Sequence, residues 1–363
     1  MSVVAVGAAA ALALAACGTN NNSTSTGSSS AAGTASITCS SGSIKASGST
    51  AQKNAISTWI NNYQSKCSGA TINYSASGSG AGIQDFINNQ VAFAGSDSAL
   101  NATTEQPKAN ARCGSGNMAW NLPMVVGPIG VTYNLTGVTK LVLSPSVLAQ
   151  IFSGKITKWN DPAITALNSG QTLPSTTITT YHRSDSSGTT DNFTKYLTAA
   201  APADWTYGHS KSWAAPGGLG AKGSDQVAAS IKSTPNSIGY VEYSFIQNDN
   251  LSSAELDNGG GAVTLSPASA SLAAAQATIV GTNGDLTLQL NYATKTPGAW
   301  PIILVTYEIV CNKGNGSSVD LVKNFLTYTA STDGQALLNG VGSAPIPPSI
   351  LTKVQASVSQ LAA

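Results

Sequence analysis

Charged side chains are scarce in this chain. Of its 363 residues, 17 are Lys or Arg and 16 are Asp or Glu. They make up 9% of the chain, where a soluble domain usually has roughly 25%. The net charge of +1 excludes a nucleic-acid binder that acts through bulk positive potential, and it excludes an acidic disordered tail protein. Ser, Thr, Asn and Gly must supply most of the polar surface, which favours an exported protein over a cytosolic one.

Metal ligands and catalytic bases are also few. The chain has two histidines, His182 and His209, and no C-x-x-C spacing, so we expect no metal site and no cofactor. It contains neither a G-x-x-x-x-G-K-[ST] loop nor a G-x-S-x-G elbow. His182 adjoins Arg183, but strand alternation turns the two side chains to opposite faces. A nucleophile with an activating base is therefore not expected, and the chain is predicted not to be an enzyme.

The first residues predict export. Residues 1–16 are apolar and uncharged, too few for a membrane-spanning helix of about 20 residues, and typical of a secretory signal. They end in Leu-Ala-Ala-Cys17-Gly, which resembles the bacterial lipobox, in which the Cys is lipidated. The first charged residue is Lys45, so no positive segment precedes the apolar run, and a plain leader with a chance Cys is the alternative. Residues 17–37 are expected to be a lipidated Cys and a flexible Ser/Gly tether.

The remaining four cysteines form an even set, as expected for disulfides in an exported chain. Three pairings are possible. We favour Cys39–Cys67, because both residues precede consecutive predicted strands and would lie at one sheet edge, which leaves Cys113–Cys311. Free buried thiols are the alternative.

One local pattern occurs three times. Strands are predicted at 43–46, 71–76 and 176–181, and each is followed by a Gly/Ser/Thr turn and a helix, the first beginning at Ala51. The first N–H groups of a helix have no internal partner, so such turns can bind an anion. A single turn of this kind is usually only an N-cap. Three in one chain, one of them carrying Arg183, indicate an oxyanion site.

Asp97 ends the run of residues 91–97, whose apolar character predicts a buried strand. Asp97 could cap the next segment, or it could accept a hydrogen bond from a protonated anion. A buried acceptor without a donor costs about 1–3 kcal/mol. Since sulfate carries no proton at neutral pH, an acid in this place would favour phosphate over sulfate.

Five motifs occur in an order that resembles the PstS family, the phosphate-binding proteins of the bacterial high-affinity ABC phosphate importer. They are residues 78–97, 151–160, 183–190, 218–223 and 237–243. The resemblance implies an α/β, two-lobed periplasmic-binding-protein-like (type II) fold with two crossing hinge strands, for which the apolar runs 124–133 and 300–310 are candidates. Lobe one would be residues 38–127 plus 302–363, and lobe two residues 128–301.

The resemblance also implies a phosphate site with Asp97 as proton acceptor, Arg183 as the cationic ligand and Asp185 orienting it. The predicted phosphate-binding residues are Ser49, Thr50, Ala51, Ser79, Asp97, Arg183, Ser187, Gly188 and Thr189. Two positions depart from the family: Ala51 stands where members often have a bulky residue, and Ser186 where they often have Gly.

The function expected from this resemblance is the capture of inorganic phosphate and its delivery to the permease of an ABC importer. The protein would be a monomer, lipid-anchored at the outer face of the bacterial cytoplasmic membrane. Receptors for sulfate or molybdate, an exported phosphate-ester hydrolase, and a surface sensor or adhesin on the same fold are the alternatives. Because the charges of Arg183 and Asp97 cancel, affinity is expected to depend weakly on ionic strength.

Overall fold

The computed structural model describes residues 37–363. The predicted signal segment, Cys17 and the tether as far as residue 36 lie outside this range. The α-helices are α1 (Lys53–Lys66), α2 (Ser79–Ile87), α3 (Gln106–Cys113), α4 (Pro145–Phe152), α5 (Pro162–Leu167), α6 (Gly188–Ala200), α7 (Gly223–Ser233), α8 (Tyr243–Asp249), α9 (Pro267–Ala274), α10 (Val319–Thr329), α11 (Thr332–Ala336) and α12 (Pro348–Ser359), with 3-10 turns η1 (Gly316–Ser318) and η2 (Leu338–Val341). In this described part, no helix has the length and apolar character needed to cross a membrane.

The strands are β1 (Gly42–Gly48), β2 (Ala70–Ser75), β3 (Phe93–Ser96), β4 (Ala119–Asn134), β5 (Val142–Leu143), β6 (Thr179–Arg183), β7 (Leu219–Ala221), β8 (Ser237–Glu242), β9 (Ser252–Ser253), β10 (Glu255–Asp257), β11 (Ala262–Val263), β12 (Thr278–Ile279), β13 (Leu288–Gln289) and β14 (Ile303–Cys311). The main sheet has the order β2-β1-β3-β14-β4-β8-β6-β7, with β9 also paired to β4. The pairs β1–β2, β1–β3, β6–β7 and β6–β8 are parallel, whereas β14 and β4 are antiparallel to their neighbours.

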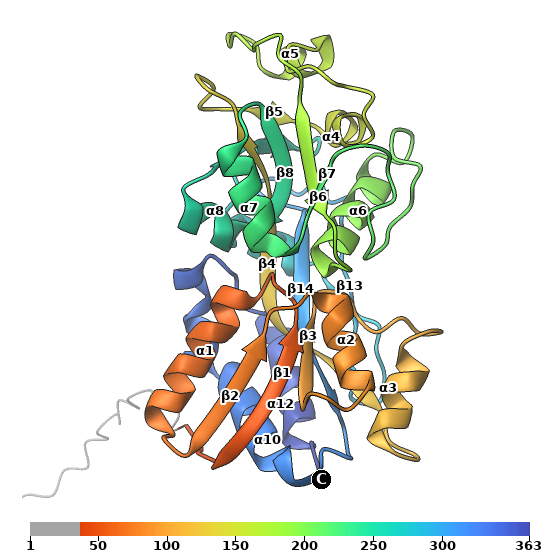
Figure 1. Ribbon diagram of the computed structural model, residues 1–363, viewed down its shortest axis with the longest axis vertical. Helices are drawn as coiled ribbons and strands as arrows, with labels where there is room; N and C mark the ends of the chain where they lie inside the picture. The colour runs from red at the N-terminus through yellow and green to blue at the C-terminus, as the bar shows by residue number, and fades with distance from the viewer. Residues whose placement is uncertain (1–36) are drawn as a thin grey trace, which may run out of the picture. The chain divides into compact units, whose positions relative to one another are not determined.

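Two long strands connect two groups of parallel strands (Figure 1). We call the part around β1, β2 and β3 the β1 half, and the part around β6, β7 and β8 the β6 half. β14 pairs with β4 over Ala119–Pro128, and β4 then pairs with β8 from Ile129 onward. These strands contain most of the two apolar runs expected to cross between lobes, and the fold is the predicted two-lobed α/β fold.

The exact lobe boundaries stay a prediction. The hairpin β12–β13 falls in the range assigned to lobe two. The adjoining residues nevertheless bond to β4 at the β1 half: Leu286 donates its N–H to the carbonyl of Asn121 (3.1 Å), and Asn121 donates its N–H to Asp285 Oδ1 (2.6 Å).

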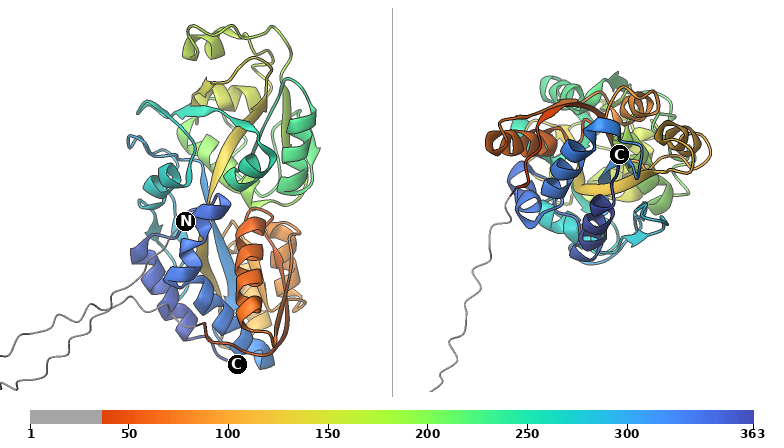
Figure 2. Two further views of the ribbon diagram at one scale, coloured as in Figure 1. Left: turned by 90° about the vertical axis from the view of Figure 1, so that its left-hand side faces the viewer. Right: turned by 90° about the horizontal axis from the view of Figure 1, so that it is seen from below.

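Helices cover both faces of the sheet in the β1 half. α1, α10 and α12 lie together over one face (Figure 2), and α2 and α3 lie over the other. Trp59 of α1 donates its indole N–H to the carbonyl of Gly334 (2.7 Å), and Tyr63 packs edge-on against Phe325 with ring centroids 5.6 Å apart. In the β6 half, α7 and α8 lie on one side and α6 on the other (Figure 1).

The three predicted strand–turn–helix units are present, with shifted ends. α1 buries Ile56, Trp59, Ile60 and Tyr63 as the periodicity predicted, but it begins at Lys53 rather than Ala51. The reason is local: Ser49 Oγ accepts the N–H of Ala51 (3.0 Å), which fixes a turn ahead of the helix. β6 starts and ends later than predicted, so its last residue is the arginine that was expected in the following turn.

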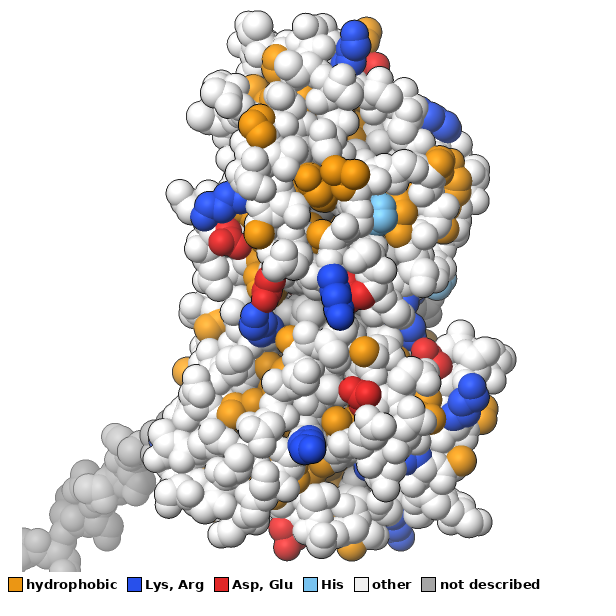
Figure 3. Space-filling view, in the orientation of Figure 1, with side chains coloured by type: hydrophobic (Ala, Val, Ile, Leu, Met, Phe, Trp, Pro, Cys, Tyr) orange, Lys and Arg blue, Asp and Glu red, His pale blue; other side chains and the backbone are white. Residues whose placement is uncertain are grey.

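Two disulfides join the favoured cysteine pairs. Cys39 and Cys67 have Cα atoms 5.3 Å apart, and Cys113 and Cys311 have Cα atoms 5.5 Å apart. The first pair ties the start of the described chain to the end of α1, and the second ties α3 to β14. On the face of the molecule drawn in Figure 3, Lys, Arg, Asp and Glu side chains are few and scattered, as the composition implied.

Candidate functional site

The predicted ligands follow the carboxyl ends of parallel strands. Ser49 comes directly after β1, Asp97 directly after β3, and Arg183 ends β6. Ligand sites of α/β sheets commonly occupy this edge. The edges of the two halves meet, since Thr50 Oγ1 lies 2.9 Å from Ser224 Oγ at the start of α7. The structure therefore brings the early and late ligand candidates to one junction.

Asp97 is the centre of a buried hydrogen-bond network. Its side chain is 3% exposed. Ser49 and Thr306 donate their hydroxyl groups to Oδ1 (2.5 and 2.8 Å), and Ser79 donates to Oδ2 (3.0 Å). A carboxylate offers about four lone-pair sites, so one acceptor site remains, on Oδ2. Burial raises the pKa of Asp97 to about 6, because the hydroxyl donors offset the desolvation only in part.

The start of α6 lies against this acid. A Cβ at Gly188 would be 2.6 Å from Ser79 Oγ and 2.8 Å from Asp97 Oδ2, so only glycine allows this approach. Asn192 fixes the approach by donating its side-chain N–H groups to the carbonyls of Asp97 (2.7 Å) and Gly188 (2.8 Å). Because α6 begins at Gly188, the N–H groups of Gly188 and Thr189 have no partner within the helix.

Arg183 is the buried cation of the junction, 2% exposed. Asp185 accepts two of its five N–H groups, from Nε (2.7 Å) and Nη2 (2.5 Å), and Nη1 donates two more to hydroxyl oxygens, which leaves one N–H on Nη2 without a partner among the described residues. Nη1 lies 3.3 Å from Ser224 Oγ and 3.3 Å from Thr189 Oγ1. Burial lowers the pKa of Arg183, but the Asp185 carboxylate outweighs this and raises it, so the guanidinium stays charged. Asp185 therefore contacts the Arg183 guanidinium, and its role in orienting Arg183 toward a ligand stays a prediction.

Several predicted donors have protein partners in this structure. The Ala51 N–H bonds to Ser49 Oγ, and the Ser187 N–H bonds to the carbonyl of Lys211 (2.8 Å). Thr189 donates its hydroxyl to Glu242 Oε1 (2.5 Å) and so has only its backbone N–H left to give. Ser187 Oγ accepts the N–H of Thr190 (3.2 Å), which makes Ser187 the N-cap of α6.

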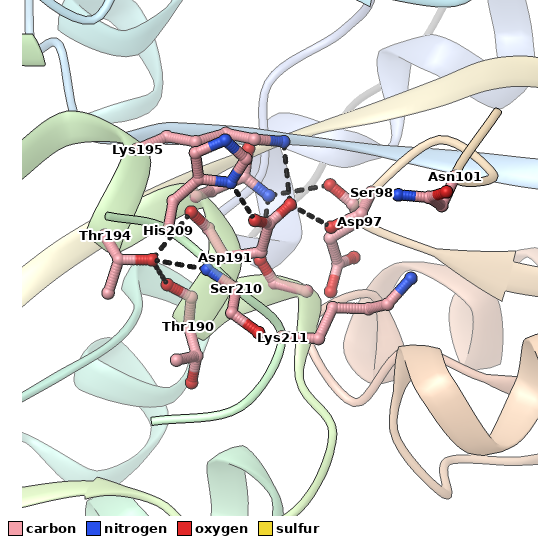
Figure 4. Close-up of polar contacts among 12 residues, drawn as sticks. Asp97, Ser98, Asn101, Thr190, Asp191, Thr194, Lys195, His209, Ser210 and Lys211 are labelled. Atoms are coloured by element: carbon pink, nitrogen blue, oxygen red, sulfur yellow. Dashed lines mark hydrogen bonds and ion pairs between the residues drawn. The ribbon is translucent and has the colours of Figure 1, made fainter. Parts of the chain in front are cut away.

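A second polar cluster bridges the halves next to this junction. Asp191 of α6 accepts hydrogen bonds from Ser98 Oγ (2.6 Å) and His209 Nδ1 (2.8 Å) and pairs with Lys195 Nζ (2.7 Å) (Figure 4). Burial would raise the pKa of Asp191, but these partners hold it well below its usual range. The cluster lines a cleft of about 390 Å³, and Lys211 pairs across it with a glutamate of the β1 half, Glu105 (2.7 Å).

Comparison with known proteins identifies the family. The model of the PBP superfamily domain matches residues 25–333. Phosphate-binding protein PstS 3 of Mycobacterium tuberculosis is 47% identical over 324 residues, which cover 88% of this chain and 86% of that protein. Phosphate-binding protein PstS of Xylella fastidiosa is 34% identical over 308 residues, with 83% of this chain and 80% of that protein covered. The chain belongs to the PstS family.

Solved structures agree with this fold. A phosphate-binding protein from Stenotrophomonas maltophilia has a TM-score of 0.65 at 19% identity, covering 87% of this chain and 93% of that one. A putative phosphate ABC transporter substrate-binding protein from Clostridium perfringens, with bound phosphate, has a TM-score of 0.61 at 17% identity, covering 84% and 100%. At these identities the likeness to the PstS-type proteins concerns the fold.

Besides Asn192, four further polar residues of the junction in this PstS-family chain were not predicted as ligands. They are Ser224, Glu242, Thr306 and Glu308, all buried. Ser224 directly follows the motif at 218–223, and Glu242 lies within the motif at 237–243, so these two could have been found. Thr306 and Glu308 lie two residues apart in an apolar strand, a spacing that puts both on one face. Among residues 37–363, no group of three or more His, Cys, Asp or Glu residues is placed to hold a metal ion.

Proposed function

We propose that this chain captures inorganic phosphate between its two halves and delivers it to the permease of an ABC importer, as a binding protein rather than an enzyme. The residues predicted to bind phosphate are the proposed ligands: Ser49, Thr50, Ala51, Ser79, Asp97, Arg183, Ser187, Gly188 and Thr189. The names of the curated relatives and the motifs in this sequence support the ligand class. A ligand touched by both halves would favour the closed arrangement, which a permease could recognise.

The observation that carries the proposal is the pairing of one acceptor with many donors. Asp97 keeps one acceptor site on Oδ2, and the start of α6 lies directly against it. The donors around it are backbone N–H groups at the start of α6, a hydroxyl group of the Thr50–Ser224 pair and the guanidinium of Arg183, whose Nη1 also lies against that pair. A monohydrogen or dihydrogen phosphate can satisfy both kinds of group, since it offers oxygens to the donors and one O–H to the acid.

Titration calorimetry tests this at neutral pH with phosphate, arsenate and sulfate. We expect phosphate to bind and arsenate to compete, because both carry a proton, and we expect sulfate to be rejected. Tight binding of sulfate would assign the chain to the receptors of unprotonated oxyanions. Hydrolysis of a phosphate ester at a rate above buffer would reassign it to the hydrolases. Arg183→Ala is expected to weaken phosphate binding more than Asp97→Asn, since it removes the buried cation of the junction.

The membrane anchor belongs to the same proposal, as do the lobe boundaries, with lobe one at residues 38–127 plus 302–363 and lobe two at residues 128–301. We propose that residues 1–16 are removed on export, that Cys17 carries the lipid, and that the monomer is tethered to the outer face of the cytoplasmic membrane. Mass spectrometry of the mature N-terminus tests the lipid, with Cys17→Ser as the matched control. Light scattering of the Ser variant tests the monomer. An unmodified Cys17 or an intact leader would contradict the anchor.

A further inference from the structure

Glu308 of β14 is a buried carboxyl group beside the proposed site that no step above uses. Its side chain is 0% exposed, and neither oxygen has a hydrogen-bond partner among the described residues. An ionised carboxylate without partners is too costly in such surroundings, and the group normally takes up a proton instead. The packing of Glu308 therefore fits the neutral acid.

The position of Glu308 links it to Asp97. It stands opposite Gly95, two residues before Asp97, in the antiparallel pair of β14 with β3. Two residues earlier on β14, Thr306 donates its hydroxyl to Asp97 Oδ1 (2.8 Å). Strand alternation puts Thr306 and Glu308 on one face of β14. Glu308 is therefore the next group along the face that already supports the acid.

A chain of hydrogen bonds connects the surroundings of Glu308 to the turn after β1, which contains Ser49. A Cβ at Gly95 would lie 2.1 Å from Gln52 Nε2 and 2.6 Å from Tyr74 Oη, so these two side chains fill the space that Gly95 leaves. Gln52 donates to Tyr74 Oη (3.0 Å), and Tyr74 donates to the carbonyl of Ser49 (2.8 Å). The Gln52 amide is the polar side chain that faces Glu308, and its Oε1 has no donor among the described residues.

We infer that Glu308 is a positioning residue of the anion site that acts in its protonated form, and that its ionisation opposes anion binding beside Asp97. This rests on the proposed function. Loss of the proton would put a second negative charge next to Asp97, which repels the ligand, and would disturb the Gln52–Tyr74–Ser49 chain. A permanently neutral residue of the same shape would keep the arrangement at every pH.

The titratable groups that act on Glu308 are few. Asp97 at the end of β3 and Tyr74 of β2 face it, whereas its neighbours from β4 and from the turn before α1, Leu122 and Gln52, are neutral. Burial, the largest cause, raises the pKa of Glu308 to about 8, because the Gln52 side chain, which favours the ionised form, offsets it only in part and the charge of Asp97 adds to it. The change of charge therefore falls just above neutral pH.

The decisive variant is Glu308→Gln, compared with wild type by calorimetry with phosphate from pH 6 to pH 10. The ratio of the two affinities cancels the titration of phosphate itself. We expect similar affinities at pH 6–7 and, above pH 8, a relative loss in the wild type of up to about tenfold per pH unit. Glu255→Gln is the matched control, because Glu255 lies in β10 and pairs with Lys140 (3.2 Å), so its profile should follow the wild type. A constant wild-type to Glu308→Gln ratio up to pH 10 would overturn the inference.

A measurement on the wild type covers the case in which the variant does not fold. Carbon-13 NMR of glutamate-labelled protein should show one carboxyl group that titrates near pH 8 without phosphate and at higher pH with it. Glutamate signals that all titrate in the ordinary acidic range would overturn the inference. Wild type that binds no phosphate at pH 7 would instead remove the proposed function, even if the high-pH carboxyl group were observed.

Discussion

Asp97→Asn should reduce the preference of the proposed site for phosphate over sulfate. In the proposed site, the unfilled acceptor site on Asp97 Oδ2 would face the anion. With phosphate it accepts a hydrogen bond to a charged group, which contributes about 1.5–3 kcal/mol. With sulfate it stays unpaired, at a cost of about 1–3 kcal/mol. The amide removes both effects, because its Nδ2 can donate to either anion.

The expected change is large in the ratio of affinities. Phosphate affinity should fall at least about tenfold and sulfate affinity should rise at least about fivefold, so the preference for phosphate should fall at least about fiftyfold. Paired calorimetric titrations with the two anions at pH 7.5 measure this. The control is Asp85→Asn, because Asp85 bonds to a serine hydroxyl of the same half (Ser47 Oγ, 2.7 Å) and lies outside the junction. An Asp97→Asn protein that still rejects sulfate as strongly as the wild type would refute the reasoning.

Three further outcomes follow from the contacts. Ser224→Ala should weaken phosphate binding about 2- to 13-fold in calorimetry with the phosphate-to-sulfate ratio unchanged, since its hydroxyl joins the halves without meeting the proton acceptor. In denaturant titrations, Glu308 should make the wild type lose up to about 5 kcal/mol of stability relative to Glu308→Gln between pH 4.5 and pH 8, because the folded state keeps a proton that the unfolded chain has released; a flat difference would contradict this. Replacing Cys113 and Cys311 by Ser should cost roughly 5 kcal/mol in chemical unfolding, given their separation of 198 residues, and a loss under 1 kcal/mol would contradict the entropic account.

Sequence patterns located those parts of the site that are built from residues close together in the chain. The turn after β1, the start of α2 and the start of α6 each follow a strand within a few residues, so periodicity and small residues located them. The strand alternation also placed His182 correctly away from the junction: its ring stacks on Trp213, with centroids 4.8 Å apart, while Arg183 faces the ligand candidates. Whether these candidates bind phosphate remains a prediction.

Residues supplied by distant strands could not be located in the same way. Thr306 reaches Asp97 only because β14 returns between β3 and β4, more than 200 residues later in the chain. Periodicity shows that such a strand is buried but not which strands it joins. The donor assignments remain predictions, but a turn alone could not show their protein partners: Ser224 and Glu242, from other elements, contact the hydroxyl groups of Thr50 and Thr189.

The carboxylates of the junction explain why net charge is a poor guide to this site. An anion site with four acids and one guanidinium would repel its ligand if all the acids were free and ionised. Asp185 is bonded to Arg183, Glu242 accepts the Thr189 hydroxyl, and the surroundings of Glu308 fit its neutral form. That leaves Asp97 as the acid that would face the proposed ligand, and three hydroxyl groups already spread its charge. Discrimination then comes from matching donors and acceptors at short range, so affinity for phosphate should change little between low and physiological salt, unlike that of a site built from exposed lysines.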